Sequence, residues 1–170
     1  MSIPTSTLRT SLLHAALFTA TAASGAEVYF NTVALTTTEV TTPANWVGGV
    51  FPGTGDIAGW MTDADPVTAG GQESRGGVLT VASPVTWLGL RHEDSVGAMT
   101  LTGSPITLGA SGITEVRWEP LTIQNSITLA ASQTWTNTAV FNATGVISGG
   151  FGLTKSGSGV LTVGNANTYT

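Results

Sequence analysis

The sequence predicts an all-β protein that folds as a parallel β-solenoid, in which short strands stack in successive rungs. The first indication is the composition, because only 9% of the residues are charged, against about 25% in an ordinary globular chain. The second is that apolar residues alternate with Thr or Ser in short runs from residue 77 onward, which is the period of a strand. The third is that the chain contains no Asn-Gly or Asp-Gly dipeptide, the preferred turn of tight antiparallel hairpins. A stacked solenoid therefore fits the pattern better than an antiparallel sandwich.

Residues 1–26 are expected to form a removable export signal. Arg9 supplies a positive charge near the start, residues 11–20 are mostly apolar, and residues 24–26 are small, as a cleavage site requires. The apolar run is shorter than the roughly 20 residues that span a bilayer. The alternative interpretation is a soluble or disordered N-terminal tail.

Residues 27–77 are expected to form a strand and a loop-rich N-terminal cap. Residues 27–38 are rich in β-branched and aromatic side chains, which predicts one strand pair or a continuous edge strand. Residues 41–77 then combine three prolines with many glycines. That density of Pro and Gly argues against any helix longer than a turn or two.

Residues 78–170 are expected to form the rungs of the solenoid. Pairs of apolar residues such as Leu79 and Val81 are separated by a Thr, so each strand buries one face and exposes the other. The strands recur too closely for helical crossovers between them, and a rung of about 20 residues is expected. The predicted strands are 78–82, 85–90, 98–102, 105–109, 113–118, 121–124, 127–130, 133–137, 139–143, 145–148, 152–155 and 160–163.

Residues 147–170 carry a recognisable repeat. They read ISGGFGLTKSGSGVLTVGNANTYT, with the order G-L-x-K-x-G-x-G-x-L-x-V followed by N-x-Y. This order resembles the autotransporter-associated β-strand repeat, also called the passenger-associated transport repeat. The residues at the signature positions are Gly152, Leu153, Lys155, Gly157, Gly159, Leu161, Val163, Asn167 and Tyr169.

The resemblance implies a right-handed parallel β-helix in the passenger region of an exported bacterial surface protein. It places the protein outside the cell or at the outer membrane of a Gram-negative-type bacterium, as an expected monomer. Because Thr170 falls inside the repeat, we expect this chain to be the N-terminal part of a longer protein. A translocator barrel or a surface anchor is then expected in the missing C-terminal part.

The charge of the chain bears on its partners. The net charge is −5 and no basic cluster occurs, so no nucleic-acid partner is expected, because such binding depends on neutralising phosphates. Cysteine is absent, so packing and hydrogen bonds must stabilise the fold without disulfides.

Two polar clusters in loops or turns are candidates for chemistry. Asp63 and Asp65 lie two residues apart but lack the ligand spacing of a Ca²⁺ loop. His92 precedes Glu93 and Asp94, yet it is the single His of the mature chain and cannot form a multi-histidine zinc site. We interpret both clusters as structural, the first as an acidic loop and the second as a charged turn.

A third cluster alternates charged and apolar residues. Glu115, Arg117 and Glu119 are interleaved with Val116 and Trp118. On a strand this spacing predicts an exposed row of charges on one face and the apolar pair on the other. The two carboxylates would lie farther apart than a glycosidase pair requires. We therefore expect no catalytic residue, no metal site and no cofactor.

The tryptophans divide into two groups. Trp87 and Trp135 lie within apolar strands and are expected in the core. Trp46 and Trp60 lie in the predicted loop-rich cap and are the candidates for exposed contacts with a glycan.

Three functional hypotheses follow. The first is a non-catalytic structural or passenger segment of an exported surface protein, acting as a stalk that assists secretion and display. The alternative is a carbohydrate-binding or adhesin module that contacts a surface glycan on a host or neighbouring cell. The third, a polysaccharide lyase or hydrolase, would need clustered Asp, Lys and Arg on adjacent rungs, and the chain has few basic residues. An enzyme is therefore not expected.

Overall fold

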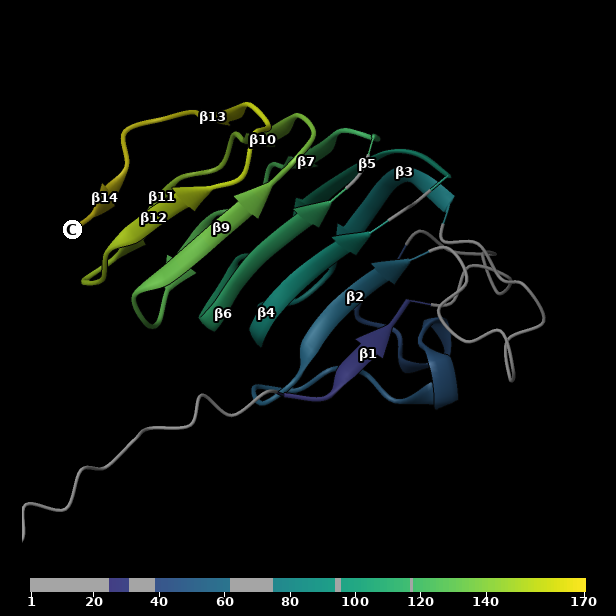
Figure 1. The fold of residues 1–170 in the computed structure, drawn as a ribbon. Helices are drawn as coiled ribbons and strands as arrows, with labels where there is room; N and C mark the ends of the chain where they lie inside the picture. The colour runs from purple at the N-terminus through teal and green to yellow at the C-terminus, as the bar shows by residue number, and fades with distance from the viewer. Residues whose placement is uncertain (1–24, 31–38, 62–74, 94–95, 117) are drawn as a thin grey trace, which may run out of the picture.

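The computed structural model describes residues 25–30, 39–61, 75–93, 96–116 and 118–170 (Figure 1). Residues 1–24 of the expected export signal lie outside this part of the chain. The described residues are all-β apart from two short 3-10 turns, η1 (Pro43–Asn45) and η2 (Val47–Gly49). No helix in these segments has the length and apolar character that crossing a membrane requires.

The described strands are short, with several longer ones near the middle of the chain. They are β1 (Glu27–Tyr29), β2 (Ile57–Met61), β3 (Arg75–Val81), β4 (Val85–Glu93), β5 (Val96–Gly103), β6 (Ile106–Val116), β7 (Leu121–Ile123), β8 (Ile127–Leu129), β9 (Gln133–Asn137), β10 (Phe141–Ala143), β11 (Ile147–Gly149), β12 (Leu153–Ser156), β13 (Leu161–Val163) and β14 (Thr168–Tyr169).

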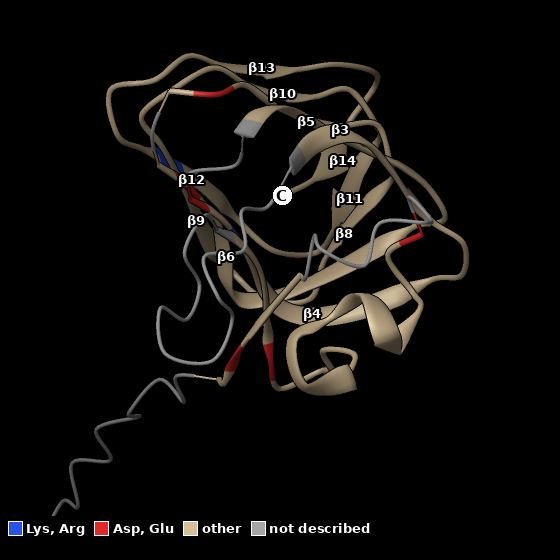
Figure 2. Ribbon diagram, turned by 90° about the vertical axis from the view of Figure 1, so that its right-hand side faces the viewer, with Lys and Arg blue, Asp and Glu red and all other residues tan. Residues whose placement is uncertain are grey.

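The strands pair in parallel and form two sheets. One sheet has the order β1-β2-β4-β6-β8-β11-β14, with β9 pairing with both β6 and β12. The other has the order β13-β10-β7-β5-β3. Seen in Figure 2, β10 and β13 form one side of the coil, β9 and β12 a second, and β8, β11 and β14 a third. The predicted all-β parallel solenoid is confirmed.

The strand register gives the length of each rung. Phe141 pairs with Leu121 in one direction and with Leu161 in the other, so the two last rungs each advance by 20 residues. Leu121 pairs with Met99, so the preceding rung advances by 22. The expected rung of about 20 residues is confirmed. Glu115 pairs with Asn137 and Leu121 with Phe141, so the two extra residues of the longer rung lie between Glu115 and Leu121.

Columns of apolar side chains fill the coil. Leu79 lies opposite Leu101, which lies opposite Ile123, and Ile123 lies opposite Ala143. All four are buried, while the Thr residues between them alternate to the outer face, as the sequence pattern predicts. Burial of each Leu or Ile contributes about 2 kcal/mol, so neighbouring rungs hold each other through a continuous core.

The N-terminal segment closes one end of the core with aromatic rings. β1 and β2 extend the first sheet in parallel, so part of the region predicted as a loop-rich cap is a strand, β2. Trp46 packs against Phe30 and Trp60 with ring centroids 5.2 and 5.4 Å away. Its indole N–H donates to the Val40 carbonyl at 2.7 Å. The cap is therefore a packed aromatic cluster that shares the solenoid core.

Candidate functional site

A buried column of polar side chains runs along one corner of the coil. His92 of β4 lies opposite Glu115 of β6, and Glu115 lies opposite Asn137 of β9. The three are exposed by only 1%, 0% and 0%. Three stacked polar groups at inward positions are unusual in a chain whose other columns are apolar, since burying a polar group is costly unless it is hydrogen-bonded.

The position of Glu115 corrects the prediction of an exposed row of charges. β6 is a single strand rather than the two predicted strands, and its pairing with β4 shifts between Trp87 and Gly89. Ile106 and Leu108 are buried before the irregular pairing and Ile113 and Glu115 after it, so the alternation of buried residues changes side within β6. Val116 is only half-buried and Trp118 is exposed. A change of one residue in the alternation exchanges the two faces of a strand.

The buried column holds the turns of the following rungs. One carboxylate oxygen of Glu115, Oε2, accepts hydrogen bonds from the backbone N–H groups of Thr138 and Ala139 at 3.2 and 3.0 Å. The side-chain amide of Asn137 donates to the carbonyls of Ala139 and Val160 at 2.9 and 3.0 Å. Glu115 and Asn137 therefore stabilise the turns that follow them, which is a structural role.

Burial also sets the protonation of two members of this column. It lowers the pKa of His92 from 6.5 to about 4, because the charged imidazolium would lose its hydration. It raises the pKa of Glu115 against the opposing effect of the two backbone hydrogen bonds. His92 lies within β4 rather than in the predicted charged turn, and Asp94 lies outside the described residues. Neither His92 nor Glu115 is open to a substrate.

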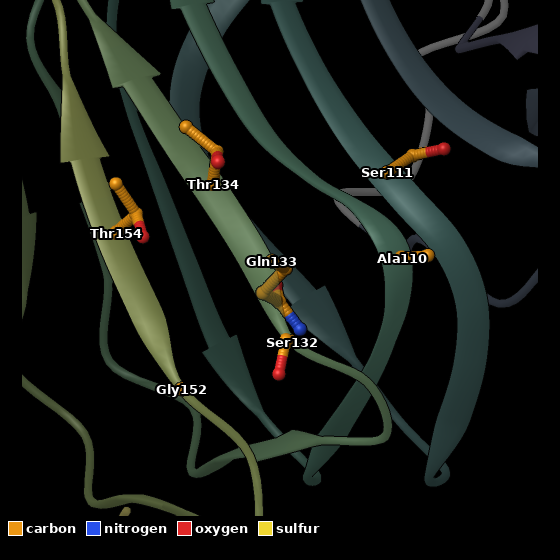
Figure 3. Close-up of a pocket in the computed structure, with 7 residues that line it drawn as sticks. All are labelled: Ala110, Ser111, Ser132, Gln133, Thr134, Gly152 and Thr154. Carbon is orange, nitrogen blue, oxygen red and sulfur yellow. The ribbon is translucent and has the colours of Figure 1, made fainter. Parts of the chain in front are cut away.

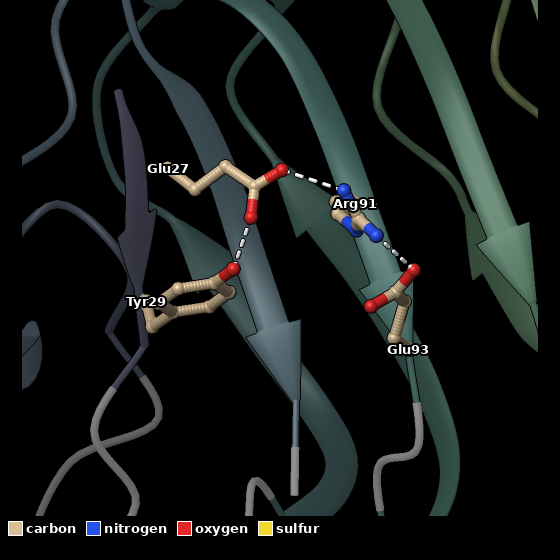
Figure 4. A network of polar contacts seen from close by, with 4 residues as sticks. All are labelled: Glu27, Tyr29, Arg91 and Glu93. Carbon is tan, nitrogen blue, oxygen red and sulfur yellow. Dashed lines mark hydrogen bonds and ion pairs between the residues drawn. The ribbon is translucent and has the colours of Figure 1, made fainter. Parts of the chain in front are cut away.

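Four polar residues connect β1 and β4 on the outer face (Figure 4). Arg91 contacts Glu27 at 2.6 Å and Glu93 at 2.5 Å, and the Tyr29 hydroxyl donates to Glu27. Burial and the bond to Glu27 raise the pKa of Tyr29 to about 12. The hydrogen bond with Glu93 raises the pKa of Arg91. A neutral phenol and a cation held by two carboxylates do not form an acid–base pair. The cluster is best explained as a structural link between β1 and β4, which lie on either side of β2.

A hollow of about 410 Å³ is lined by residues of β6 and by residues at the starts of β9 and β12 (Figure 3). Gln133 is buried there, and its side-chain amide donates to the carbonyls of Leu108 and Ala131. Its side-chain oxygen accepts the indole N–H of Trp135 at 2.9 Å. The lining residues are Ala110, Ser111, Ser132, Gln133, Thr134, Gly152 and Thr154. None of these described residues is charged, so this hollow offers neither a general base nor a metal ligand set.

A second hollow, of about 350 Å³, lies beside an exposed tryptophan. Its described lining residues are Trp118, Thr138, Ala139, Val140, Ser158, Gly159 and Val160. Trp118 is 87% exposed. Sequence reasoning missed it because Trp118 was assigned to the buried face of a strand. The signal that could have found the hollow is the spacing, since positions 138 and 158, like 140 and 160, are one 20-residue rung apart.

The expected exposure of Trp46 and Trp60 is wrong. They are exposed by only 1% and 0%, because the N-terminal aromatic cluster packs them together with Phe30 and Trp87. Neither ring presents a face to solvent, so neither can stack on a glycan in this structure. Trp87 and Trp135 are buried, as predicted.

The glycines and Asn of the repeat signature shape the last rungs. Gly157 has φ +80°, and a Cβ there would lie 2.3 Å from the Asn137 carbonyl oxygen. A Cβ at Gly159 would lie 2.1 Å from the Ala139 carbonyl oxygen. Asn167 accepts from the Ile147 N–H at 2.8 Å and donates to the Gly164 carbonyl at 3.0 Å. These residues allow close stacking of one rung on the previous one.

The other signature residues form the edge of the core and the outer surface. Leu153, Leu161 and Tyr169 are partly buried against the core. Val163 is 42% exposed, Lys155 is exposed and donates to the Gly157 carbonyl, and Gly152 lines the hollow of Figure 3. No catalytic role is indicated for any of them.

Among the described residues, no group of three or more His, Asp or Glu side chains could hold a metal ion. Asp63 and Asp65 lie outside these residues, so the structure does not bear on the predicted acidic loop. A scan against protein-family models, a search of curated proteins and a search of solved structures each found no match.

Proposed function

We propose that this chain is a non-catalytic structural segment of an exported bacterial surface protein, in which stacked rungs form a stalk. The observation that carries the proposal is the continuous in-register stacking of rungs of 20 to 22 residues, with each column of inward side chains shared between neighbours. The repeat that residues 147–170 resemble supports export and display at the cell surface.

The polar groups support a structural role over a catalytic one. Glu115 and Asn137 are committed to the backbone of neighbouring turns, and Arg91 is held by two carboxylates. A catalytic site requires a group that can reach a substrate with an adjustable proton or charge. These side chains are instead arranged to stabilise the stacking of rungs.

The mechanism is the templating of one rung by another. Each strand presents backbone N–H and C=O groups along its edge, and the next rung pairs with them in parallel. Among the described strands, β13 and β14 pair on one side only, with β10 and β11. Leu161 and Tyr169 add partly buried apolar side chains at this edge. A further rung with the same pattern would cover both.

The test is to produce the chain with its own N-terminus in a Gram-negative host and to follow its location. We expect mass spectrometry of the recovered protein to show removal of residues 1–26 and recovery outside the cytoplasm. A matched chain lacking residues 2–26 should remain in the cytoplasm. Cytoplasmic retention of the full chain with an intact N-terminus would contradict export, and the stalk proposal would then be abandoned.

A further inference from the structure

The exposed Trp118 is the exception among the tryptophans of this protein. The chain has five, and the other four are 0–1% exposed, whereas Trp118 is 87% exposed. Trp combines a large apolar ring with one N–H, and exposed Trp is enriched where a ligand or partner covers it. An indole face in contact with water therefore needs an explanation in a chain whose other four tryptophans are buried.

Trp118 lines the second hollow, here called the groove, together with two equivalent turns. The turn between β9 and β10 contributes Thr138, Ala139 and Val140, and the turn between β12 and β13 contributes the equivalent residues one rung later, Ser158, Gly159 and Val160. The hydrogen bond from the Phe141 N–H to the Val160 carbonyl, 2.9 Å, holds these turns together. The same set of surfaces is thus presented twice, one strand spacing of about 4.8 Å apart.

The lining of the hollow combines small, hydroxyl and apolar residues. Ala139 and Gly159 are the middle residues of the two turns, each with a hydroxyl residue before it and a valine after it in the chain. Val140 and Val160 are 43% and 63% exposed. The hollow therefore offers exposed valines, hydroxyl groups and one exposed indole ring.

These features fit a neutral sugar chain. A pyranose ring has an apolar face of C–H groups and a rim of hydroxyls, which match an indole face and a Ser or Thr edge. The strand spacing is close to the length of one sugar unit along an extended β-linked polysaccharide, so two successive units would span the two turns. The hollow, at about 350 Å³, lies within the range of small-ligand sites, about 300–1,000 Å³.

The charge and the size of the surface disfavour other occupants. None of the described lining residues is charged, and the chain carries a net charge of −5, so an anionic polymer would find no counter-charge there and would be repelled by the whole molecule. A stable protein partner needs about 1,000 Å² or more of buried surface. The exposed apolar side chains of this groove are only Trp118, Val140 and Val160, which is a small area for such an interface.

We propose that the groove formed by Trp118 and the turns at residues 138–140 and 158–160 binds a short stretch of a neutral, extended, β-linked polysaccharide. One sugar unit stacks on the indole of Trp118, and the following units lie along the valines with their hydroxyls toward Thr138 and Ser158. The proposal does not depend on export, because the groove is a property of the folded rungs. It also moves the expected glycan contact from the buried Trp46 and Trp60 to Trp118.

The experiment is a titration of the full chain with three neutral β-1,4-linked hexasaccharides: cellohexaose, xylohexaose and mannohexaose. Intrinsic tryptophan fluorescence and calorimetry report binding, and Trp118 should dominate the fluorescence change because the other indoles are shielded from solvent. We expect at least one hexasaccharide to bind and Trp118→Ala to weaken it by about tenfold or more, as loss of a stacked ring implies. Trp118→Phe should retain part of the affinity.

The control variant is Val78→Ala, which removes an exposed apolar side chain of β3 that does not line the groove (57% exposed) and should leave binding unchanged. Because Trp118 is exposed, its replacement should leave thermal unfolding nearly unchanged. Absence of binding to all three sugars overturns the proposal, as does unchanged binding by Trp118→Ala. Tighter binding of hexagalacturonate than of any neutral sugar also overturns it. Sedimentation that shows self-association dependent on Trp118, without sugar binding, would instead identify a protein contact.

Discussion

The buried imidazole of His92 should make the stability of the solenoid depend on pH. His92 lies on β4 between Trp60 of β2 and Glu115 of β6, and burial lowers its pKa from 6.5 to about 4. Between these two pH values the unfolded chain binds a proton at this residue and the folded protein does not. The free energy of unfolding therefore falls as the pH falls from about 6.5 to about 4.

The magnitude follows from the two pKa values. Each pH unit between them corresponds to about 1.4 kcal/mol, so the full destabilisation by His92 is about 3 kcal/mol at pH 4 and below, and about 2.5 kcal/mol at pH 4.5. Above pH 6.5 it is absent. Glu115 acts in the opposite direction, because its pKa is raised in the folded protein and its ionisation at higher pH costs stability. The effect of His92 must therefore be isolated from that of Glu115.

The assay is urea unfolding at pH 7.5 and pH 4.5, with His92→Gln compared to the parent chain and the comparison repeated in a Glu115→Gln background. Glutamine does not titrate, and the cost of its different shape is the same at both pH values. We expect the parent to lose about 2.5 kcal/mol more than the His92→Gln variant on acidification. If the parent and the His92→Gln variant lose equal stability on acidification, both with Glu115 and with Gln at position 115, the pH dependence does not arise from a buried neutral His92.

Three further predictions concern the stacking of rungs, each checked by urea or thermal unfolding. Gly145→Ala should lower stability by about 1–3 kcal/mol, because the added Cβ would lie 1.9 Å from the backbone carbonyl oxygen of Asn125 in the preceding rung. Gly150→Ala is the matched control and should leave stability nearly unchanged, because a Cβ added there meets no atom within 4 Å. Leu161→Asp should destabilise the last rung by about 2 kcal/mol or more, since a carboxylate would replace a side chain packed on the core. The control Thr162→Asp, at an exposed position, should leave stability nearly unchanged. Unchanged stability of Leu161→Asp would count against rung templating. Glu115→Ala should cost about 1–3 kcal/mol, because the Ala139 N–H loses its acceptor, whereas the Thr138 N–H keeps its hydrogen bond to the backbone carbonyl of residue 115. Glu115→Gln should retain most of this stability, since its amide oxygen can also accept. If alanine and glutamine behave alike, the side chain does not hold the turn.

Local periodicity was enough to predict most strands from the sequence. The segment 133–137 was predicted as a strand and is β9, Gln133–Asn137. The rung length and the inward columns of Leu, Ile and Val were also predictable, because alternation of apolar and polar residues reports which side of a strand is buried wherever the strand is regular. Composition and turn chemistry then separated a stacked solenoid from a sandwich of hairpins.

The candidate sites could be predicted much less well, since they depend on irregularities and on contacts between distant segments. The change of buried side within β6, near its irregular pairing with β4, places Glu115 in the core, whereas Trp118, beyond the end of β6, is exposed. The packing of Phe30, Trp46 and Trp60 at the end of the coil buried two rings that a loop-rich sequence suggested were exposed. The period of the rungs can be read from the amino-acid order, because it depends on residues close together in the chain. Which polar and aromatic side chains meet solvent depends on the rungs above and below them, so it becomes visible only in the folded protein.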